Sequence, residues 1–207
     1  MPLIRKPPSG SLVPPPAPFD AAALSDGSSD VRWAAVRVAA SRPDAVALLG
    51  GALARERDPR VREAIFSGLA RIATEESAGI IVPYLRSEDA SLRTGALDAL
   101  HVMPAATAAY LPALVTDKDP DVRLLSCELA RAQPAATANR LLCAVLDTDP
   151  EKNVCAAALD VLAETGGPEI LASLNRCAQR FQDDPFLAFS IDVVRQQIGT
   201  QPASARE

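Results

Sequence analysis

The chain has 207 residues, of which 48% are hydrophobic and only 4% aromatic, and its formal net charge is −5. This length supports one sizeable core, and the many small apolar residues favour close packing of helices. The alternating runs of Val, Ile, Thr and Tyr that would predict strands are absent, so we expect an all-α fold. The excess of acidic residues argues against general nucleic-acid binding. The sequence contains no apolar run of about 20 residues, so no membrane span is predicted.

The two ends of the chain differ in composition from its middle. Residues 1–18 carry seven of the 18 prolines, which favour extended conformations, so we expect a flexible tail there. A ligand for the aromatic groove of a partner is the alternative role of this tail. Residues 200–207 are predicted to be a disordered end. Residues 19–199 remain as one repeat domain, which opens with a short helix in the segment FDAAALSDG.

One pattern recurs along the repeat domain: an apolar residue followed by arginine, about every 31 residues. The copies are Val31-Arg32, Val61-Arg62, Leu92-Arg93, Val122-Arg123 and Val154-Cys155, with cysteine in place of the last arginine. Repetition at this period is typical of stacked helical repeats. Each copy is therefore predicted to be a pair of helices.

Five helices have a start signal, an aspartate that suits the N-cap and in most cases a proline that suits the first helical position. These signals are Asp58-Pro59, Asp89, Asp119-Pro120, Asp149-Pro150 and Asp184-Pro185. The first helices are predicted to end before prolines at one shared position, Pro43, Pro104 and Pro134. Pro83 and Pro112 lie within the second helices and predict kinks there.

The aligned copies form columns of one chemical character. Positions four, five and eight residues after the Val or Leu are apolar or small, which predicts that they face neighbouring helices. The position six residues after is polar throughout and is predicted to face outward: Arg37, Ser67, Asp98, Glu128 and Asp160. A helix pair alone cannot bury its apolar stripe, so the pairs must stack. We therefore predict an all-α fold, an α-solenoid of about five helical hairpins, followed by a helix near residues 184–198.

The segment YLPALVTDKDPDVR has almost the full order Leu-x-Pro-x-Leu, Asp and Val-Arg, with Tyr110 at the place of the first leucine. The segment IVPYLRSEDASLR repeats this order with variations. In this order the chain resembles the HEAT-repeat family over about residues 20–198. Its short period is similar to the subclass named after phycobilisome lyases, which occurs in bacterial proteins of many roles. The resemblance implies an α-α superhelix whose concave face is lined by the helices that carry Val-Arg.

The resemblance also implies that the motif's charged residues are structural. Asp58, Asp89 and Asp119 are expected to cap their own helices. The arginines are expected to lie along the stack and to pair with acidic groups of the adjoining repeat. The last copy departs from the family pattern, because Cys155 replaces the arginine and two residues are added before Val154. We therefore expect a weaker ladder and an atypical copy at this end.

Little in the sequence indicates catalysis, a metal or a cofactor. His101 is the only histidine, and the iron-dependent enzymes with HEAT-like repeats need several His-Glu pairs. No phosphate-binding loop is found, so Gly50-Gly51 and Gly166-Gly167 are interpreted as packing or turn glycines. The four cysteines have no CxxC spacing and are expected to be core residues in helices, which favours a reducing, cytoplasmic location. We expect no enzyme, no cofactor and no metal.

The leading hypothesis is a non-catalytic scaffold or adaptor that binds a partner protein on the concave face. Two alternatives remain: an accessory subunit resembling bilin lyases, and a HEAT-like protein that binds DNA lesions. Trp33 is interpreted either as a contact residue or as packed under the N-terminal tail or the first short helix. The candidate partner-binding residues are Trp33, Arg37, Glu63, Arg71, Thr94, Asp98, His101, Leu124, Glu128, Arg131 and Asp160.

Overall fold

The computed structural model of the chain describes residues 19–200, and this part contains helices and turns but no strand. The predicted tail, residues 1–18, and residues 201–207 of the predicted end lie outside the described residues. The α-helices are α1 (Ser29–Ala39), α2 (Ala45–Leu53), α3 (Pro59–Ile72), α4 (Glu75–Ile81), α5 (Ala90–His101), α6 (Pro104–Thr107), α7 (Leu111–Leu114), α8 (Pro120–Arg131), α9 (Ala135–Thr148), α10 (Lys152–Thr165), α11 (Leu171–Arg180) and α12 (Pro185–Thr200). Three 3₁₀ segments complete the elements: η1 (Ala21–Ser25), η2 (Val82–Arg86) and η3 (Pro168–Ile170).

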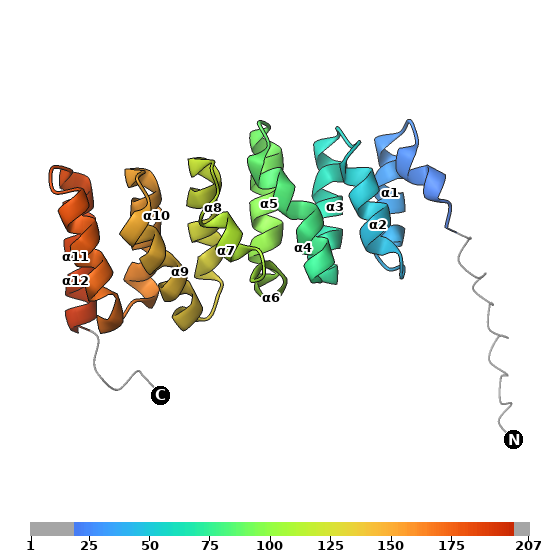
Figure 1. Cartoon of the computed structure of the whole chain (residues 1–207). Helices are drawn as coiled ribbons and strands as arrows, with labels where there is room; N and C mark the ends of the chain where they lie inside the picture. The colour runs from blue at the N-terminus through green and yellow to red at the C-terminus, as the bar shows by residue number, and fades with distance from the viewer. Residues whose placement is uncertain (1–18, 201–207) are drawn as a thin grey trace, which may run out of the picture.

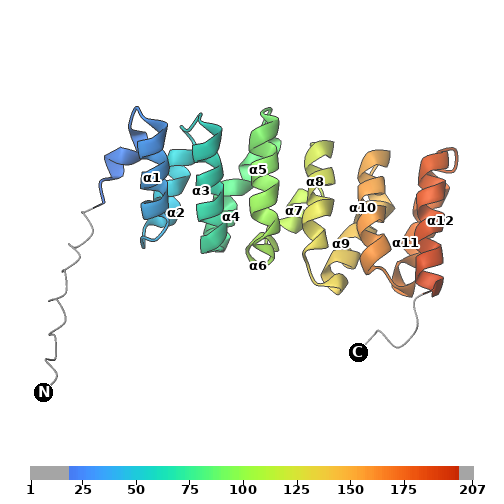
Figure 2. The same cartoon turned by 180° about the vertical axis from the view of Figure 1, so that it is seen from behind.

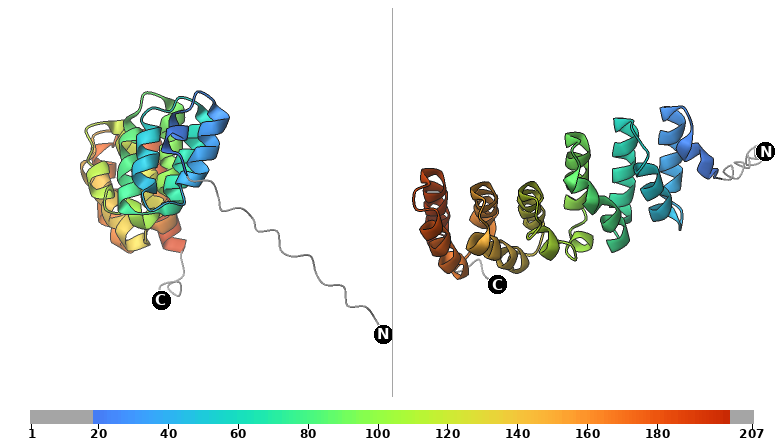
Figure 3. Two further views of the ribbon diagram at one scale, coloured as in Figure 1. Left: turned by 90° about the vertical axis from the view of Figure 1, so that its right-hand side faces the viewer. Right: turned by 45° about the horizontal axis from the view of Figure 1, so that its top comes forward.

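These elements form five helical hairpins in a row and one further helix. The first helices α1, α3, α5, α8, α10 and α12 contact one another in succession and make one layer (Figure 2). The second helices α2, α4, α7, α9 and α11 make the other layer (Figure 1). The row is elongated and curved, as the right-hand view of Figure 3 shows. The predicted all-α solenoid is confirmed. None of the described helices is long and apolar enough to cross a membrane.

The columns predicted to be buried form the interior of this stack. All residues at the positions four and eight after the Val or Leu are buried: Ala35, Ile65, Ala96, Ser126, Ala158, Ala39, Leu69, Leu100, Ala130 and Leu162. At the fifth position Leu97 alone is half-buried and the other four residues are buried. The outward column is exposed except for Glu128, which is half-buried. Small residues in the buried columns let neighbouring first helices approach closely.

Aspartate caps begin four of the first helices, as predicted. The carboxylate of Asp58 accepts from the Arg60 N–H at 2.9 Å, and Asp89 and Asp119 make the equivalent bond at the starts of α5 and α8. Asp184 accepts from two N–H groups at the start of α12. The start predicted at Asp149-Pro150 is wrong, because α10 begins two residues later, at Lys152. The added residues there leave Asp149 in the preceding turn, where its buried carboxylate binds Arg123.

The prolines interrupt the second helices at both expected places. Helix α4 ends at Ile81 and continues as the 3₁₀ segment η2, whose second residue is Pro83. Helices α6 and α7 are separate short pieces, and Pro112 lies in the first turn of α7. Proline lacks the N–H that a continuous helix needs at these positions. The predicted kinks are therefore complete breaks in the α-helical hydrogen bonding.

The arginines of the repeated pair share one hydrogen bond that the sequence did not predict. Each guanidinium donates to the backbone carbonyl six residues before it, at the loop that enters the helix. The donor–acceptor distances are 2.8 Å for Arg32 to Asp26, 2.9 Å for Arg62 to Glu56, 2.6 Å for Arg93 to Ser87 and 2.9 Å for Arg123 to Asp117. Each arginine therefore fixes the loop of its own repeat to its first helix.

Three of these arginines also pair with an acid of the next repeat, as predicted. Arg32 binds Glu56 through two nitrogens at 2.8 and 2.9 Å, and Arg62 binds Asp89 at 2.8 Å. Arg123 binds Asp149 through two nitrogens at 2.6 and 3.0 Å. The pairs of Arg32 and Arg123 are the most enclosed. These joints connect consecutive repeats by a charge-assisted bond in addition to apolar packing.

The fifth copy keeps a charged donor to its entry loop although it lacks the arginine. The Cys155 sulfur lies 3.6 Å from the carbonyl oxygen of Asp149, six residues earlier. Arg180, at the end of α11, donates to the same carbonyl and also to the Leu146 oxygen at 2.6 Å. A guanidinium from the second helix therefore replaces the missing one. The last full copy is atypical, as predicted, but its loop carbonyl has a charged donor.

The four cysteines lie in helices, as predicted. Cys127, Cys155 and Cys177 are buried and Cys143 is half-buried. Burial raises the pKa of the Cys127 thiol to about 12. A thiol with so high a pKa carries almost no thiolate at neutral pH and is a poor nucleophile. This residue therefore acts as a small core residue.

We predict that Arg123→Ala lowers the free energy of unfolding by about 2–4 kcal/mol. The side chains of Arg123 and Asp149 are only 11% and 4% exposed, so the change leaves a carboxylate buried without its cation. Arg195→Ala is the control, because its pair with Asp192 lies on the surface, and it should cost no more than about 0.5 kcal/mol. Urea unfolding followed by circular dichroism measures both. Equal midpoints for the two variants would contradict this account of the joint.

Glu56 predicts a pH dependence of stability. The guanidinium of Arg32, helped by two backbone N–H groups, lowers the pKa of buried Glu56 from 4.5 to about 2. Because the folded pKa is below the unfolded one, this stabilisation is complete above pH 4.5 and is lost as the pH falls towards 2. The loss should be on the order of 2 kcal/mol after solvent screening. Unfolding measured from pH 6 to 2 should show a shallower decline for Glu56→Gln than for the parent chain.

Candidate functional site

The predicted site residues all lie on one face of the solenoid, the exposed surface of α1, α3, α5, α8 and α10, which we call the first-helix face. Seven of them are exposed: Arg37, Glu63, Arg71, Thr94, Asp98, His101 and Asp160. Four are half-buried: Trp33, Leu124, Glu128 and Arg131. The stack places them in order along its length, because equivalent positions of successive repeats point the same way. The structure gathers only some of them around a common hollow.

The first hollow lies between α1 and α3 and has a volume of about 690 Å³. Its lining follows the length of both helices. It runs from Trp33 to Ser41 on α1 and the turn after it, and from Arg60 to Arg71 on α3. We call it the α1–α3 hollow. It contains the side chains of Arg37, Arg60 and Arg71 and one acid, Glu63. The basic groups therefore outnumber the acidic ones here, although the whole chain is acidic.

Trp33 lies at one end of this hollow between two arginines. The guanidinium carbons of Arg37 and Arg60 are each 4.8 Å from the centre of the tryptophan ring. Arg60 also binds Asp30 at 2.8 Å. Both guanidiniums gain a cation–π interaction, which holds the long side chains in place. The aromatic ring thus fixes two cations at the entrance to the hollow.

Trp33 lines the α1–α3 hollow, whereas the hollow between η1 and α1 is lined from α1 by other residues, which include Val31, Ala34 and Val38. Trp33 also packs partly against the core. The N-terminal tail, the other proposed cover, lies outside the described residues. The role of Trp33 in binding stays a prediction.

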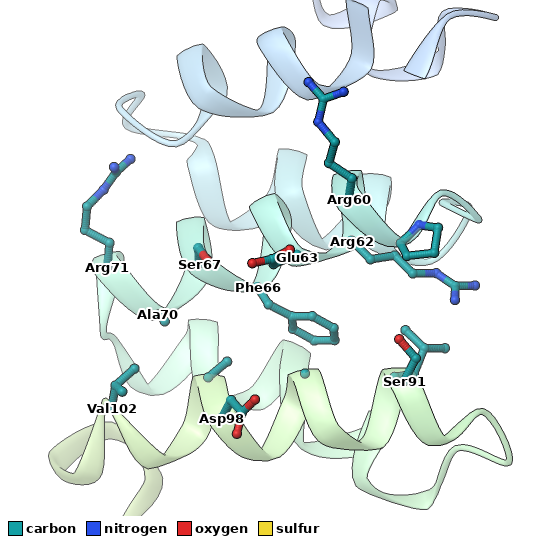
Figure 4. Close-up of a pocket in the computed structure, with 14 residues that line it drawn as sticks. Arg60, Arg62, Glu63, Phe66, Ser67, Ala70, Arg71, Ser91, Asp98 and Val102 are labelled. Carbon is teal, nitrogen blue, oxygen red and sulfur yellow. The ribbon is translucent and has the colours of Figure 1, made fainter. Parts of the chain in front are cut away.

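The second hollow lies between α3 and α5, has a volume of about 730 Å³, and is drawn in Figure 4. We call it the α3–α5 hollow. The buried Phe66 ring lies between the two helices, and a Cβ at Gly95 would come within 2.9 Å of it. Gly95 therefore makes the room that this ring occupies. Leu92, Val102 and Asp98 line the hollow from α5.

The two hollows are neighbours that share one wall, helix α3. Arg60, Glu63, Ser67 and Arg71 line both of them. Within residues 19–200, Glu63, Arg71 and Asp98 make no ion pair, so their charges are available to a ligand. The combined surface has an aromatic and aliphatic floor and charges of both signs at its rim. Such a surface is typical of protein recognition.

The C-terminal part of the first-helix face has a different character. Arg131 binds Glu128 at 3.2 Å, Asp160 at 2.6 Å and also Glu164, so these predicted site residues bind one another. Burial alone would lower the pKa of Arg131, but its hydrogen bonds to the three carboxylates outweigh this effect and raise the pKa. The cluster holds one cation among three anions. Its net charge is negative, opposite in sign to that of the α1–α3 hollow.

Three further predicted residues lie outside both hollows. Thr94 and His101 are exposed on α5 but do not line either hollow. Leu124 is half-buried and packs against the C-terminal part of the core. The role of these three residues in binding stays a prediction. No group of three His, Cys, Asp or Glu residues that could hold a metal ion occurs in the described part of the chain.

The sequence interpretation missed Arg60, Phe66 and Gly95. A signal for Arg60 was present, because the position before the Val-Arg pair is basic in this copy alone; the other copies have Asp30, Ser91, Asp121 and Asn153. Phe66 and Gly95 come from different repeats, and their contact depends on how α3 and α5 pack. Only the structure shows that contact.

We predict opposite effects for two Gly→Ala changes within helices. Gly51→Ala meets no atom closer than 3.9 Å and should stabilise the chain by about 0.5–1 kcal/mol, because alanine is the better helix former. Gly95→Ala forces the buried Phe66 ring to move and should destabilise the folded chain by about 1–2 kcal/mol. Thermal unfolding of both variants tests this. Stabilisation by Gly95→Ala would show that the ring has room to move.

Comparisons with known proteins agree with the repeat architecture. Residues 18–101 match the family model described as HEAT repeats. An engineered protein of known structure is 18% identical, with a TM-score of 0.44, covering 87% of this chain and 95% of that one. A designed armadillo repeat protein in complex with the peptide (KR)4 is 14% identical, with a TM-score of 0.44, covering 86% of this chain and 97% of that one.

The complex of CpcE and CpcF of phycocyanin lyase from Nostoc is 13% identical, with a TM-score of 0.37 and coverage of 91% of this chain and 100% of that one. No curated protein matches the chain in sequence. The resemblance that the sequence motifs indicated is confirmed over residues 18–101, where the family model matches.

Proposed function

We propose that the chain is a non-catalytic scaffold that binds a partner protein on the first-helix face. The observation that carries this proposal is the pair of adjoining hollows on either side of α3. Their volumes are about 690 and 730 Å³, and both have unpaired charges at the rim. A partner segment that fills them would bury apolar floor and pair these charges at the same time.

The mechanism is recognition by a preformed surface. Inter-repeat ion pairs and the buried columns hold α1, α3 and α5 in register, so the hollows exist before a partner arrives. Binding then requires little ordering of the scaffold, which preserves affinity. The half-buried Trp33 supplies the aromatic area that often dominates binding energy. Arg71 and Asp98 supply charges of opposite sign that select the orientation of the partner.

A non-catalytic role is supported by the chemistry of the face. His101 is the only histidine in the sequence and lies outside both hollows. Neither hollow contains a cysteine, and three of the four thiols are buried in the core. The side chains that line the hollows are suited to binding by contact and charge.

The test is an affinity pull-down from native lysate with quantitative mass spectrometry. The double variant Trp33→Glu with Asp98→Lys places a charge in one hollow and reverses a charge in the other. We expect it to reduce recovery of a specific partner by at least about tenfold. Asp98→Lys alone, at an exposed position, is the second variant in case the tryptophan change perturbs folding, which circular dichroism monitors.

The matched control is Ala144→Glu with Glu76→Lys, two exposed positions on second helices α9 and α4. It introduces the same kinds of charge on the other layer and should leave partner recovery unchanged. Equal recovery with the face variant and the parent chain would reject the proposed binding face. Equal loss with both double variants would reject it too.

A further inference from the structure

The α1–α3 hollow has a charge that identifies the chemistry of its ligand. We infer that it binds an extended peptide segment of the partner through two carboxylate side chains, one at each end of the hollow. This inference rests on the proposed function and goes beyond it by naming what the partner presents. It depends on three observations: the excess of cations, their availability and their spacing.

The excess of cations is local. Arg37 faces the hollow from α1, and Arg60 and Arg71 face it from α3, whereas Glu63 is the only acid in the lining. The chain as a whole carries a net charge of −5. A basic hollow on an acidic protein attracts acidic segments by charge while the remaining surface repels them. The ligand is therefore directed to this hollow and away from the acidic cluster around Arg131.

The cations are available for a ligand. Within the described residues Arg37 and Arg71 make no ion pair, and the Arg60–Asp30 pair has side chains 59% and 78% exposed. An exposed ion pair of this kind contributes little to stability, so Arg60 can release Asp30 and bind a ligand carboxylate at small cost. Within the described residues the Arg37 guanidinium donates no hydrogen bond, and that of Arg60 donates one, to Asp30. A guanidinium has five N–H groups, so both arginines keep donors that suit a carboxylate.

The spacing of the cations sets the length of the ligand. Figure 4 shows Arg60 and Arg71 projecting from opposite ends of α3 on the side of α1, with Glu63 and Ser67 between them. Arg60 and Arg71 are eleven residues apart on α3, so their Cα atoms are separated by about 16 Å along the helix axis. Extended chain advances about 3.3 Å per residue, so residues i and i+4, which point the same way, lie about 13 Å apart. The long arginine side chains cover the remaining few ångströms, so a five-residue segment reaches both cationic ends.

The position of Glu63 argues against a continuous polyanion, such as a phosphate backbone, as the ligand. Glu63 lies between the two cationic ends, three residues from Arg60 and eight from Arg71, and Asp98 lines the hollow on the other side of α3. Negative groups spaced evenly along a ligand would meet these carboxylates. Two separated carboxylates with uncharged residues between them avoid Glu63 and still reach the arginines. An acidic peptide segment therefore fits better than a nucleic acid.

Trp33 provides the measurement, because it is the only tryptophan and lies between two of the proposed ligand-binding arginines. The probe is a capped pentapeptide with glutamate at its first and fifth positions and Ala, Ser and Ala between them. Titration into the full chain at low ionic strength should change the Trp33 emission saturably. About 0.5 M NaCl should weaken binding several-fold by screening.

Matched peptides and variants test the geometry. A peptide with its two glutamates adjacent should bind several-fold more weakly, and one with two lysines should show no saturation. Arg37→Gln and Arg71→Gln should each raise the dissociation constant by about 2- to 10-fold. Arg140→Gln removes an exposed cation on α9, away from this hollow, and should leave the constant unchanged.

Three results would overturn the inference: no saturable change with the spaced glutamate peptide, an unchanged constant in Arg71→Gln, or tighter binding of inorganic phosphate or a ten-nucleotide oligothymidylate. The last result would assign the hollow to phosphate groups. The pull-down separates this failure from that of the proposed function. Partner loss with the face variant and no peptide binding would retain the binding face and reject the carboxylate ligand.

Discussion

Burial between consecutive repeats is the constraint on which this molecule depends. No hairpin has enough apolar surface of its own, and the fully buried columns, such as Leu69 and Leu100, face a neighbouring repeat. Every first helix is therefore held on at least one side by another first helix, and all of them run side by side. The first-helix face is a result of this packing, since the same register that buries one column exposes the column two residues away.

The arginine joints add direction and precision to the packing. Apolar side chains tolerate small shifts, but a guanidinium that binds a loop carbonyl and an acid of the next repeat fixes both distance and angle. The joints of Arg32 and Arg62 lie at the ends of α1 and α3, next to the hollows. They tie α1 and α3 to the loops that begin the next repeats. Structural charges and candidate binding charges thus lie on the same helices, a few residues apart.

The sequence predicted the fold well because repetition tests each inference several times. The Asp58 cap and the break at Pro83 follow from local rules, and equivalent residues in other copies support them. Asp149 shows the limit, since two added residues moved it from a cap to an ion pair. The site was predicted less well. Outward positions were identified, but the sequence does not specify that Arg60 and Arg37 stack on one ring, because that depends on the distance between two repeats.

Arg180 gives the solenoid a polarity. In the first four copies the guanidinium that binds the entry loop belongs to the helix that follows that loop, so the loop and its helix hold each other. In the fifth copy the corresponding guanidinium lies 25 residues beyond Cys155, at the end of α11. The entry loop of α10 therefore has its charged donor only when α11 is in place. Truncation of the chain after α10 would leave this loop with the weak Cys155 contact alone, whereas a cut after any earlier first helix would leave that helix's loop bound.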